Sequence, residues 1–512
     1  MELRGQKLVY AITAVCALAF CLFGYDNGLM GEIVTEESFL DIVGHPNASL
    51  LGFVVSSYDV GCMIGALGSM VFGDRFGRRY MIFIGCGIHI LATIVTTASF
   101  SLAQVLVSRI VIGVGMGIFT STCPVWLAEC ADASSRELMV AIQLTHLIIG
   151  TNIAFWLNYG MSFVSSSVSW RLPFAFQMVF TSSAFLLTLF LPESPRWLLA
   201  NGRQEQALKV LSDLRGDEAE GELVQAEFQD ISNALSFEAN NSGSWSSIFK
   251  GHDESKALAR IVIASAAQAL QSCTGICFLE YYFPFILENS VGLSSNISSL
   301  VSGFSQVWYL LSSFLTWVLI RRLGRRRLFF LGSGGMGFTM MAITICLWYN
   351  SKPASEVSVA FLFLYLSFFT WGWMSNMWTY PAEILPLQYR SKGLAISVFF
   401  QWAFQFWTVE IAPVSIGNIG WRSYIIWTVL NFVTLAIVYF FFPETSGMTL
   451  ESVDFMFSGD SSIFRIVRKS DKMFRKKISW EVGMAQEVAN FDFAPRDEKQ
   501  VQLHVEEADR DD

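Results

Sequence analysis

The stretch Gly73-Asp74-Arg75-Phe76-Gly77-Arg78-Arg79 closes an apolar run at residues 50–72. About 250 residues later, Arg321-Arg322-Leu323-Gly324-Arg325-Arg326 closes another apolar run. Three further landmarks recur at nearly the same spacing. They are an acid followed by arginine (Glu129 and Arg136, Glu383 and Arg390), Trp-Arg (170–171 and 421–422) and Pro-Glu-Ser/Thr (192–194 and 443–445). Self-similarity at a fixed spacing indicates an internal repeat. We therefore predict a duplicated chain with six apolar runs in each half.

The apolar runs are long enough to cross a bilayer. They fall at residues 8–25, 50–72, 80–98, 102–123, 139–160, 173–191, 258–284, 297–320, 328–349, 357–379, 393–416 and 421–442. A transmembrane helix needs about 20 mostly apolar residues, and a bilayer leaves such runs no alternative to helices. The composition agrees, since 53% of the 512 residues are hydrophobic. We predict an all-α membrane protein with twelve transmembrane helices.

Basic residues indicate the topology. Arginines gather after runs two, four, eight and ten, whereas the loops after runs one, three and seven contain no Lys or Arg. Cytoplasmic loops carry the excess of Lys and Arg, so we expect both termini to be cytoplasmic. The sequons at Asn47 and Asn296 then lie outside and are predicted glycosylation sites.

The repeat and the topology predict four parts. They are an N-terminal six-helix bundle (1–191), a cytoplasmic linker with short helices (192–257), a C-terminal six-helix bundle (258–442) and a cytoplasmic tail that is partly disordered (443–512). Basic and apolar residues interleave in the tail between residues 464 and 477. This pattern fits an interfacial helix on anionic lipid as well as it fits a solvated charged tail.

Charged residues at the cytoplasmic helix ends recur in both halves. Positive-inside anchoring explains the bases, but not the acids Glu129 and Glu383. We therefore predict ion pairs that lock the cytoplasmic face while the outer face is open and part when the protein reverses. The predicted members are Asp74, Arg75, Arg78, Glu129, Arg136, Glu193, Arg196, Arg325, Glu383, Arg390 and Glu444.

Two intramembrane charges do not belong to the repeat. Asp26 ends the first apolar run in Phe23-Gly24-Tyr25-Asp26-Asn27-Gly28, and Arg109 lies in the fourth. A lone charge in the membrane costs roughly 2.5–3.5 kcal/mol, so such residues face the interior and find partners. We predict that Asp26 and Arg109 pair. A carboxylate that gains and loses a proton beside a fixed cation is the minimum apparatus for proton coupling. A static buried pair is the alternative, and we interpret the lone histidines His89 and His146 as packing residues.

The motifs resemble those of a sugar porter of the major facilitator superfamily, in particular the fungal members. The resemblance runs from about residue 8 to 456. It rests on Phe23-Gly24-Tyr25-Asp26, residues 73–79, Ser108-Arg109-Ile110, Pro192-Glu193-Ser194-Pro195-Arg196, Pro381-Ala382-Glu383 and Pro443-Glu444-Thr445, in this order. The resemblance implies the major facilitator fold, with Asp26 as the protonatable acid of proton-coupled members and Arg109 as its partner.

The resemblance also implies a substrate site. Sugars need side-chain amides for their hydroxyls and flat aromatic rings for their C–H faces. The matching positions are Phe23, Gln143, Gln271, Tyr281, Trp378, Gln401 and Trp402. In the seventh run, Ser272 and Cys277 replace the second glutamine and the asparagine of the family pattern. A hexose is therefore less strongly indicated, and a disaccharide, a polyol, a sugar acid or a non-sugar metabolite fits equally well.

We expect a proton-coupled symporter of a sugar or polyol that works by alternating access, as a monomer in the plasma membrane. A non-transporting nutrient sensor and an exporter of a non-sugar metabolite are the alternatives. The sequence contains no nucleophile–base arrangement, phosphate-binding loop or cluster with metal-ligand spacing, so we expect no enzymatic activity, metal or cofactor. A net charge of −9 argues against nucleic acid as a partner.

Overall fold

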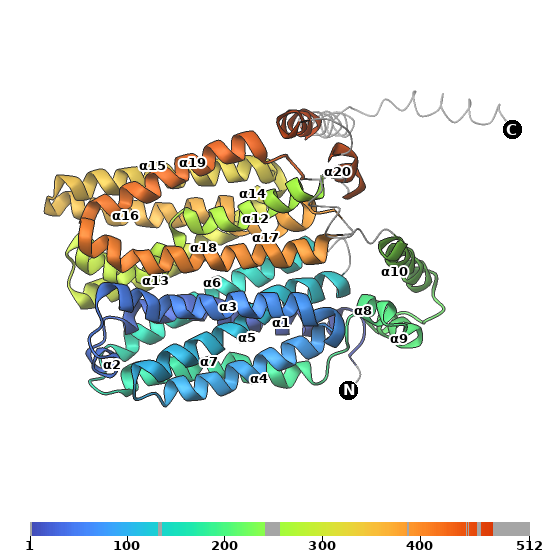
Figure 1. Cartoon of the computed structure of the whole chain (residues 1–512), viewed down its shortest axis with the longest axis horizontal. Coiled ribbons are helices and arrows are strands. Elements are labelled where there is room, and N and C mark those ends of the chain that lie inside the picture. The colour runs from blue at the N-terminus through green and yellow to red at the C-terminus, as the bar shows by residue number, and fades with distance from the viewer. Residues whose placement is uncertain are drawn as a thin grey trace, which may run out of the picture.

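The structure is a computed structural model and describes residues 3–131, 136–240, 256–386, 389–446, 448, 450–457 and 462–474. Long helices run side by side along the molecule (Figure 1). Those of the first half are α1 (Gln6–Ile33), α3 (Ala48–Phe76), α4 (Arg78–Thr97), α5 (Leu102–Cys130), α6 (Arg136–Met161) and α7 (Val168–Thr188). Those of the second half are α12 (Ala257–Cys273) with α13 (Ile276–Ile286), α14 (Ser295–Leu323), α15 (Arg325–Tyr349), α16 (Lys352–Phe369) with α17 (Asn376–Ile384), α18 (Arg390–Ile419) and α19 (Ser423–Phe441).

The helices account for the twelve predicted spans. Nine stretches of the described chain are long and apolar enough to cross a membrane, and one of them contains both α18 and α19. The helices α6 and α7 supply the remaining two spans. The first span extends beyond the predicted run, because α1 continues to Ile33. Asp26 therefore lies inside a helix rather than at its end.

The two ends of the bundle differ. Short helices α8 (Pro195–Ala200), α9 (Gln204–Arg215), α10 (Glu222–Asn240) and α20 (Leu450–Phe457) lie at one end, which we call the α9 end, and α2 (Glu37–Val43) lies at the other, the α2 end (Figure 1). Both predicted sequons belong to the α2 end. Exposed Asn47 precedes α3, and exposed Asn296 lies in the first turn of α14.

Two spans of the second half are interrupted. The seventh breaks between α12 and α13, where Gly275 adopts a φ of 94°. The tenth passes through a π-helical segment, Thr370–Met374, between α16 and α17. Interrupted helices are common where transporters bind their substrates, because unwound backbone there lines the interior. The two interruptions lie on the elements that carry Tyr281 and Trp378.

The two halves contact each other through α3 with α18, α1 with α13, and α6 with α14. On the side of the α2 end, Ser56 Oγ donates a hydrogen bond of 2.8 Å to Glu410 Oε2. Asn152 Nδ2 donates one of 2.7 Å to the Gln306 carbonyl. Polar side chains therefore join the halves across this part of the interface.

Part of the tail packs against the second half. A helical segment at residues 463–474 buries Val467 and Ser470, and Ser470 Oγ accepts a hydrogen bond of 3.0 Å from the Glu444 backbone. Its basic residues Arg465, Arg468, Lys469 and Lys472 do not take part in these contacts. The predicted disorder further on lies outside the described residues.

Candidate transport site and flanking charge networks

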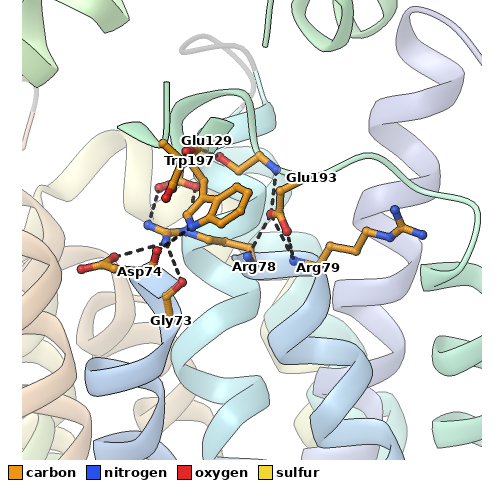
Figure 2. A network of polar contacts seen from close by, with 9 residues as sticks. Gly73, Asp74, Arg78, Arg79, Glu129, Glu193 and Trp197 are labelled. Carbon is orange, nitrogen blue, oxygen red and sulfur yellow. Dashed lines mark hydrogen bonds and ion pairs between the residues drawn. The ribbon is translucent and has the colours of Figure 1, made fainter. Parts of the chain in front are cut away.

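A charge network forms at the α9 end of the first half. Arg78 Nη2 and Nε lie 3.0 and 3.1 Å from the carboxylate oxygens of Glu129, a two-pronged pair between α4 and α5. Arg78 Nη1 also donates to the Gly73 carbonyl at 3.3 Å and to Asp74 at 3.4 Å (Figure 2). Two-pronged arginine–carboxylate contacts fix orientation as well as adding energy. The network therefore joins the ends of α3, α4 and α5.

Glu193 closes the same network from the loop before α8. Its carboxylate accepts hydrogen bonds from the backbone amides of Arg78 (2.8 Å), Arg79 (3.1 Å) and Ser194 (2.8 Å) (Figure 2). A carboxylate suits this place because the first amides of a helix have no partner within the helix. Burial raises the pKa of Glu193 above its usual value, and the three amides act in the opposite direction.

The second half repeats the arrangement. Arg325 Nη2 lies 2.8 Å from Glu383 Oε1, and Glu444 accepts from the backbone amides of Arg325 (2.9 Å) and Arg326 (3.1 Å). Thr445 Oγ1 adds a hydrogen bond of 2.6 Å to Glu383. Burial likewise raises the pKa of Glu444. The sequence repeat is therefore also a repeat of side-chain geometry.

Each of the two arginine–glutamate pairs lies within one half of the molecule, and their opening during transport stays a prediction. Arg78–Glu129 and Arg325–Glu383 each join helices of a single half, because each glutamate ends the helix that packs beside its arginine. The remaining predicted members are placed less specifically. Arg75 is exposed and lies over the Phe76 ring at 5.9 Å. Arg390 donates to the Leu385 carbonyl at 3.4 Å, Arg196 lies in α8, and the side chain of Arg136 is outside the described residues.

Gly77 should be essential to the first network. Its φ is 92°, and a Cβ there would lie 2.4 Å from Glu193 Oε2. We expect Gly77→Ala to lower the free energy of unfolding by about 2 kcal/mol, because alanine is strained in this conformation and displaces the carboxylate. Thermal unfolding of the purified protein measures the effect. Gly73→Ala is the matched control, since no atom lies within 4 Å of its Cβ. Equal melting temperatures for the two variants would contradict the assignment.

Asp26 is buried in the bundle interior beside a histidine. Its Oδ2 lies 3.6 Å from Nε2 of His89 on α4, and the side chains are 4% and 0% exposed. His89 Nδ1 lies near the hydroxyls of Thr93 (3.2 Å) and Thr181 (3.3 Å). Asp26 Oδ2 and His89 Nε2 have no hydrogen-bond partner among the described residues. The structure thus gives Asp26 an ionisable neighbour that we had interpreted as a packing residue.

Arg109 is directed toward α3 rather than toward Asp26. Its Nη2 donates to the Val55 carbonyl at 2.9 Å, and its guanidinium lies over the Tyr58 ring at 5.4 Å. No hydrogen bond or ion pair within 4 Å joins the described side chains of Arg109 and Asp26. The predicted direct pair is absent here, because α5 packs tightly against α3 whereas Asp26 faces α4. Their role in proton coupling remains a prediction.

Asp59 of α3 is an intramembrane acid that was not among the predicted site residues. Its side chain is 0% exposed, and its Oδ1 accepts a hydrogen bond of 3.3 Å from Gln405. Gln405 also donates to the Tyr281 hydroxyl at 3.0 Å, and that hydroxyl donates to Asn27 at 2.8 Å. An acid in the middle of an apolar run was the signal that should have found it.

Several predicted substrate residues meet at the interface of the halves. Phe23 of α1 and Trp402 of α18 have ring centroids 5.3 Å apart, and Tyr58 lies 6.0 Å from Trp402. Trp378 contacts Phe20 at 5.6 Å. Buried polar atoms without a hydrogen-bond partner in the described chain belong to Gln143 (Nε2), Gln401 (Oε1) and Trp402 (Nε1). Gln271 accepts a hydrogen bond of 3.2 Å from Ser272.

A two-half helical bundle with interrupted helices and with aromatic side chains that meet between its halves is typical of a membrane transporter. A model of the family "Sugar (and other) transporter" matches residues 12–457. The chain belongs to this family, and it is an integral multi-pass membrane protein of the major facilitator fold.

Known relatives agree with this assignment. The MFS-type transporter oryC of Aspergillus oryzae is 37% identical, and the match covers 93% of this chain and 90% of the relative. Sugar transporter STL1 of Saccharomyces cerevisiae is 34% identical, with 89% and 82% covered. The solved structure of the proton:xylose symporter XylE from E. coli, bound to 6-bromo-6-deoxy-D-glucose, has a TM-score of 0.76 and 26% identity, with 88% and 99% covered. These relatives are transporters rather than enzymes.

Proposed function

We propose that the protein is a proton-coupled symporter of a sugar or polyol in the plasma membrane. The observation that carries the proposal is the buried pair of Asp26 and His89, together with buried Arg109 on α5, a helix that packs against both α1 and α4. A buried carboxylate is stable as an ion only beside a cation, and it favours its protonated form when that cation is withdrawn. Movement of Arg109 relative to Asp26 therefore provides the switch that symport requires. The likeness to a proton:xylose symporter supports the same reaction.

The substrate would bind between the halves. Trp402 and Phe23 offer flat rings to sugar C–H faces, while the unpartnered atoms of Gln143, Gln401 and Trp402 offer hydrogen bonds to hydroxyls. A buried polar group without a partner costs about 1–3 kcal/mol, so a hydroxylated ligand would recover this cost on binding. The halves would then rock about the site, with the networks at the cytoplasmic α9 end keeping each half rigid.

Flux measurements test the proposal. The protein would be expressed in a transporter-deficient host and offered labelled hexoses, pentoses, disaccharides and polyols while external pH is recorded. We expect accumulation of at least one of them with alkalinisation of the medium. Accumulation without a pH change would contradict proton coupling. Absence of flux for every compound, also in reconstituted vesicles, would favour the non-transporting sensor. Efflux of a metabolite without uptake would favour the exporter.

Gln401 provides a test of the binding site. We expect Gln401→Leu to raise KM for the transported sugar about tenfold, because one substrate hydrogen bond is lost at roughly 1–1.5 kcal/mol. Leucine is similar in size, so the helix packing should persist. Initial rates of uptake over a range of substrate concentrations measure the effect. Trp407→Phe on the same helix is the control, because Trp407 is 41% exposed. An unchanged KM for Gln401→Leu would remove this residue from the site.

A further inference from the structure

Five buried polar atoms without a hydrogen-bond partner in the described chain converge around α3. They belong to Asp26 (Oδ2), Tyr58 (hydroxyl), Asp59 (Oδ2), His89 (Nε2) and Arg109 (Nε). Unsatisfied buried polar groups are rare in native proteins, and each of them calls for an explanation. Two of the five are carboxylate oxygens, whereas the guanidinium of Arg109 is the one permanent cation of the group. The group therefore contains more acid than this cation alone can neutralise.

The surroundings of Asp59 identify its possible partners. The titratable or charged side chains that interact electrostatically with it are Tyr58, Cys62, Arg109, Cys277, Tyr281 and Tyr282. Arg109 is the cation among them, and no ion pair within 4 Å joins the two side chains, both of which the structure describes. Tyr58 interacts with both Asp26 and Asp59. Arg109 donates to the Val55 carbonyl and lies over the Tyr58 ring, so it contacts the turn of α3 that carries Asp59.

We propose that Asp59 is a second proton-accepting carboxylate, and that Arg109 stabilises either Asp59 or Asp26 but not both at once. This proposal rests on the proposed symport. One cation stabilises one buried carboxylate, so the acid from which Arg109 is withdrawn takes up a proton. Two groups that interact in this way titrate as a coupled pair rather than independently. In the conformation seen here, Asp26 Oδ2 lies 3.6 Å from His89 Nε2, while Arg109 contacts Val55 and Tyr58 on the turn of α3 that carries Asp59.

The hydrogen bonds of Asp59 connect its protonation to contact between the halves. Asp59 belongs to the first half, whereas Gln405 and Tyr281, which continue the chain of hydrogen bonds to Asn27, belong to the second. Separation of the halves on this side breaks the hydrogen bond that Gln405 donates to Asp59, and a hydrogen bond to a carboxylate favours its charged form. Opening toward the α2 end would therefore promote protonation of Asp59.

Infrared difference spectroscopy tests this directly, because it requires neither substrate nor transport. The purified full chain would be compared at mildly acidic and mildly alkaline pH, and the C=O band of protonated carboxyl groups recorded. We expect Asp59→Asn and Asp26→Asn each to remove part of this band. Asp41→Asn, a change at an exposed acid of α2, should leave the buried component unchanged. A wild-type band in Asp59→Asn would overturn the proposal, because the other acid would then account for the whole signal.

A measurement on the unmodified chain covers the case in which Asp59→Asn does not fold. Dicyclohexylcarbodiimide reacts with protonated carboxyl groups inside membranes, and peptide mass spectrometry locates the adduct. We expect modification at Asp59 that decreases as the pH rises. Modification at Asp26 without any at Asp59 would contradict the proposal. If the unmodified chain showed no symport in the flux assays but formed the Asp59 adduct, the proposed function would be rejected. The assignment of Asp59 as a proton-accepting carboxylate would still hold.

Discussion

Asp26→Asn is expected to abolish uphill accumulation of the transported compound and the accompanying proton inflow. Asparagine has nearly the shape of aspartate but carries no titratable proton. Since Asp26 is 4% exposed and 3.6 Å from His89, the substitution removes the acid without opening a cavity. Equilibration of substrate down its own gradient should continue, because the rings and amides of the binding site are unchanged. Loss of coupling with retention of exchange is the signature of a proton-carrying group.

The comparison requires two measurements on the same membranes. Uptake against a gradient, with and without an imposed pH difference, reports coupling, and exchange of labelled for unlabelled substrate reports the remaining cycle. Asp41→Asn is the matched control, since this acid is exposed. Full accumulation by Asp26→Asn would contradict the assignment. Loss of both activities with normal protein abundance would show that Asp26 is needed for the transport cycle as a whole rather than for coupling alone.

The charge networks show what a repeat can predict. Arg78, Glu129, Arg325 and Glu383 were identified because they recur at equivalent places, and the structure joins them in pairs. The role of Glu193 as an acceptor for helix amides was not visible, because backbone partners leave no trace in the side-chain sequence. The sequence also did not indicate which helices each pair would join, since a linear pattern does not determine which helices are neighbours; the structure places each pair within a single half.

The interior shows where prediction from the sequence fails. Composition and length identify a span, but a helix that is apolar all round does not reveal which face is directed inward. Asp26 and Arg109 were therefore paired as the most obvious charges, although rotation of α1 and α5 directs them to different neighbours. For the same reason the sequence did not show that His89 lies beside Asp26, and Asp59 was missed. Each becomes interpretable only once the packing of α3, α4 and α5 is known.

The contact between α3 and α5 depends on glycines that face each other. A Cβ on Gly61 would lie 1.9 Å from the Ile110 carbonyl oxygen, and a Cβ on Gly113 would lie 2.0 Å from the Tyr58 carbonyl oxygen. Gly65 and Gly117 continue the same contact one turn further along. Small residues at helix interfaces allow backbones in membranes to approach closely, where van der Waals packing is the main source of attraction. This contact holds Arg109 beside Val55 and Tyr58.

Gly61→Ala is therefore expected to destabilise the protein by about 3 kcal/mol or more, because a methyl group must separate two helices that are packed backbone to backbone. The same separation would withdraw Arg109 from Asp59, so coupled transport should fall in the fraction that still folds. Gly68 lies on the same helix, and a Cβ there would meet no neighbouring atom within 4 Å. Gly68→Ala should therefore leave the stability unchanged or raise it by up to about 1 kcal/mol, because alanine has the higher helix propensity. Thermal unfolding in detergent and the yield of monodisperse protein distinguish the two. A similar loss of stability in both variants would mean that α3 needs glycine for its flexibility. A loss of stability confined to Gly61→Ala would show that glycine is needed for the close approach of α3 and α5.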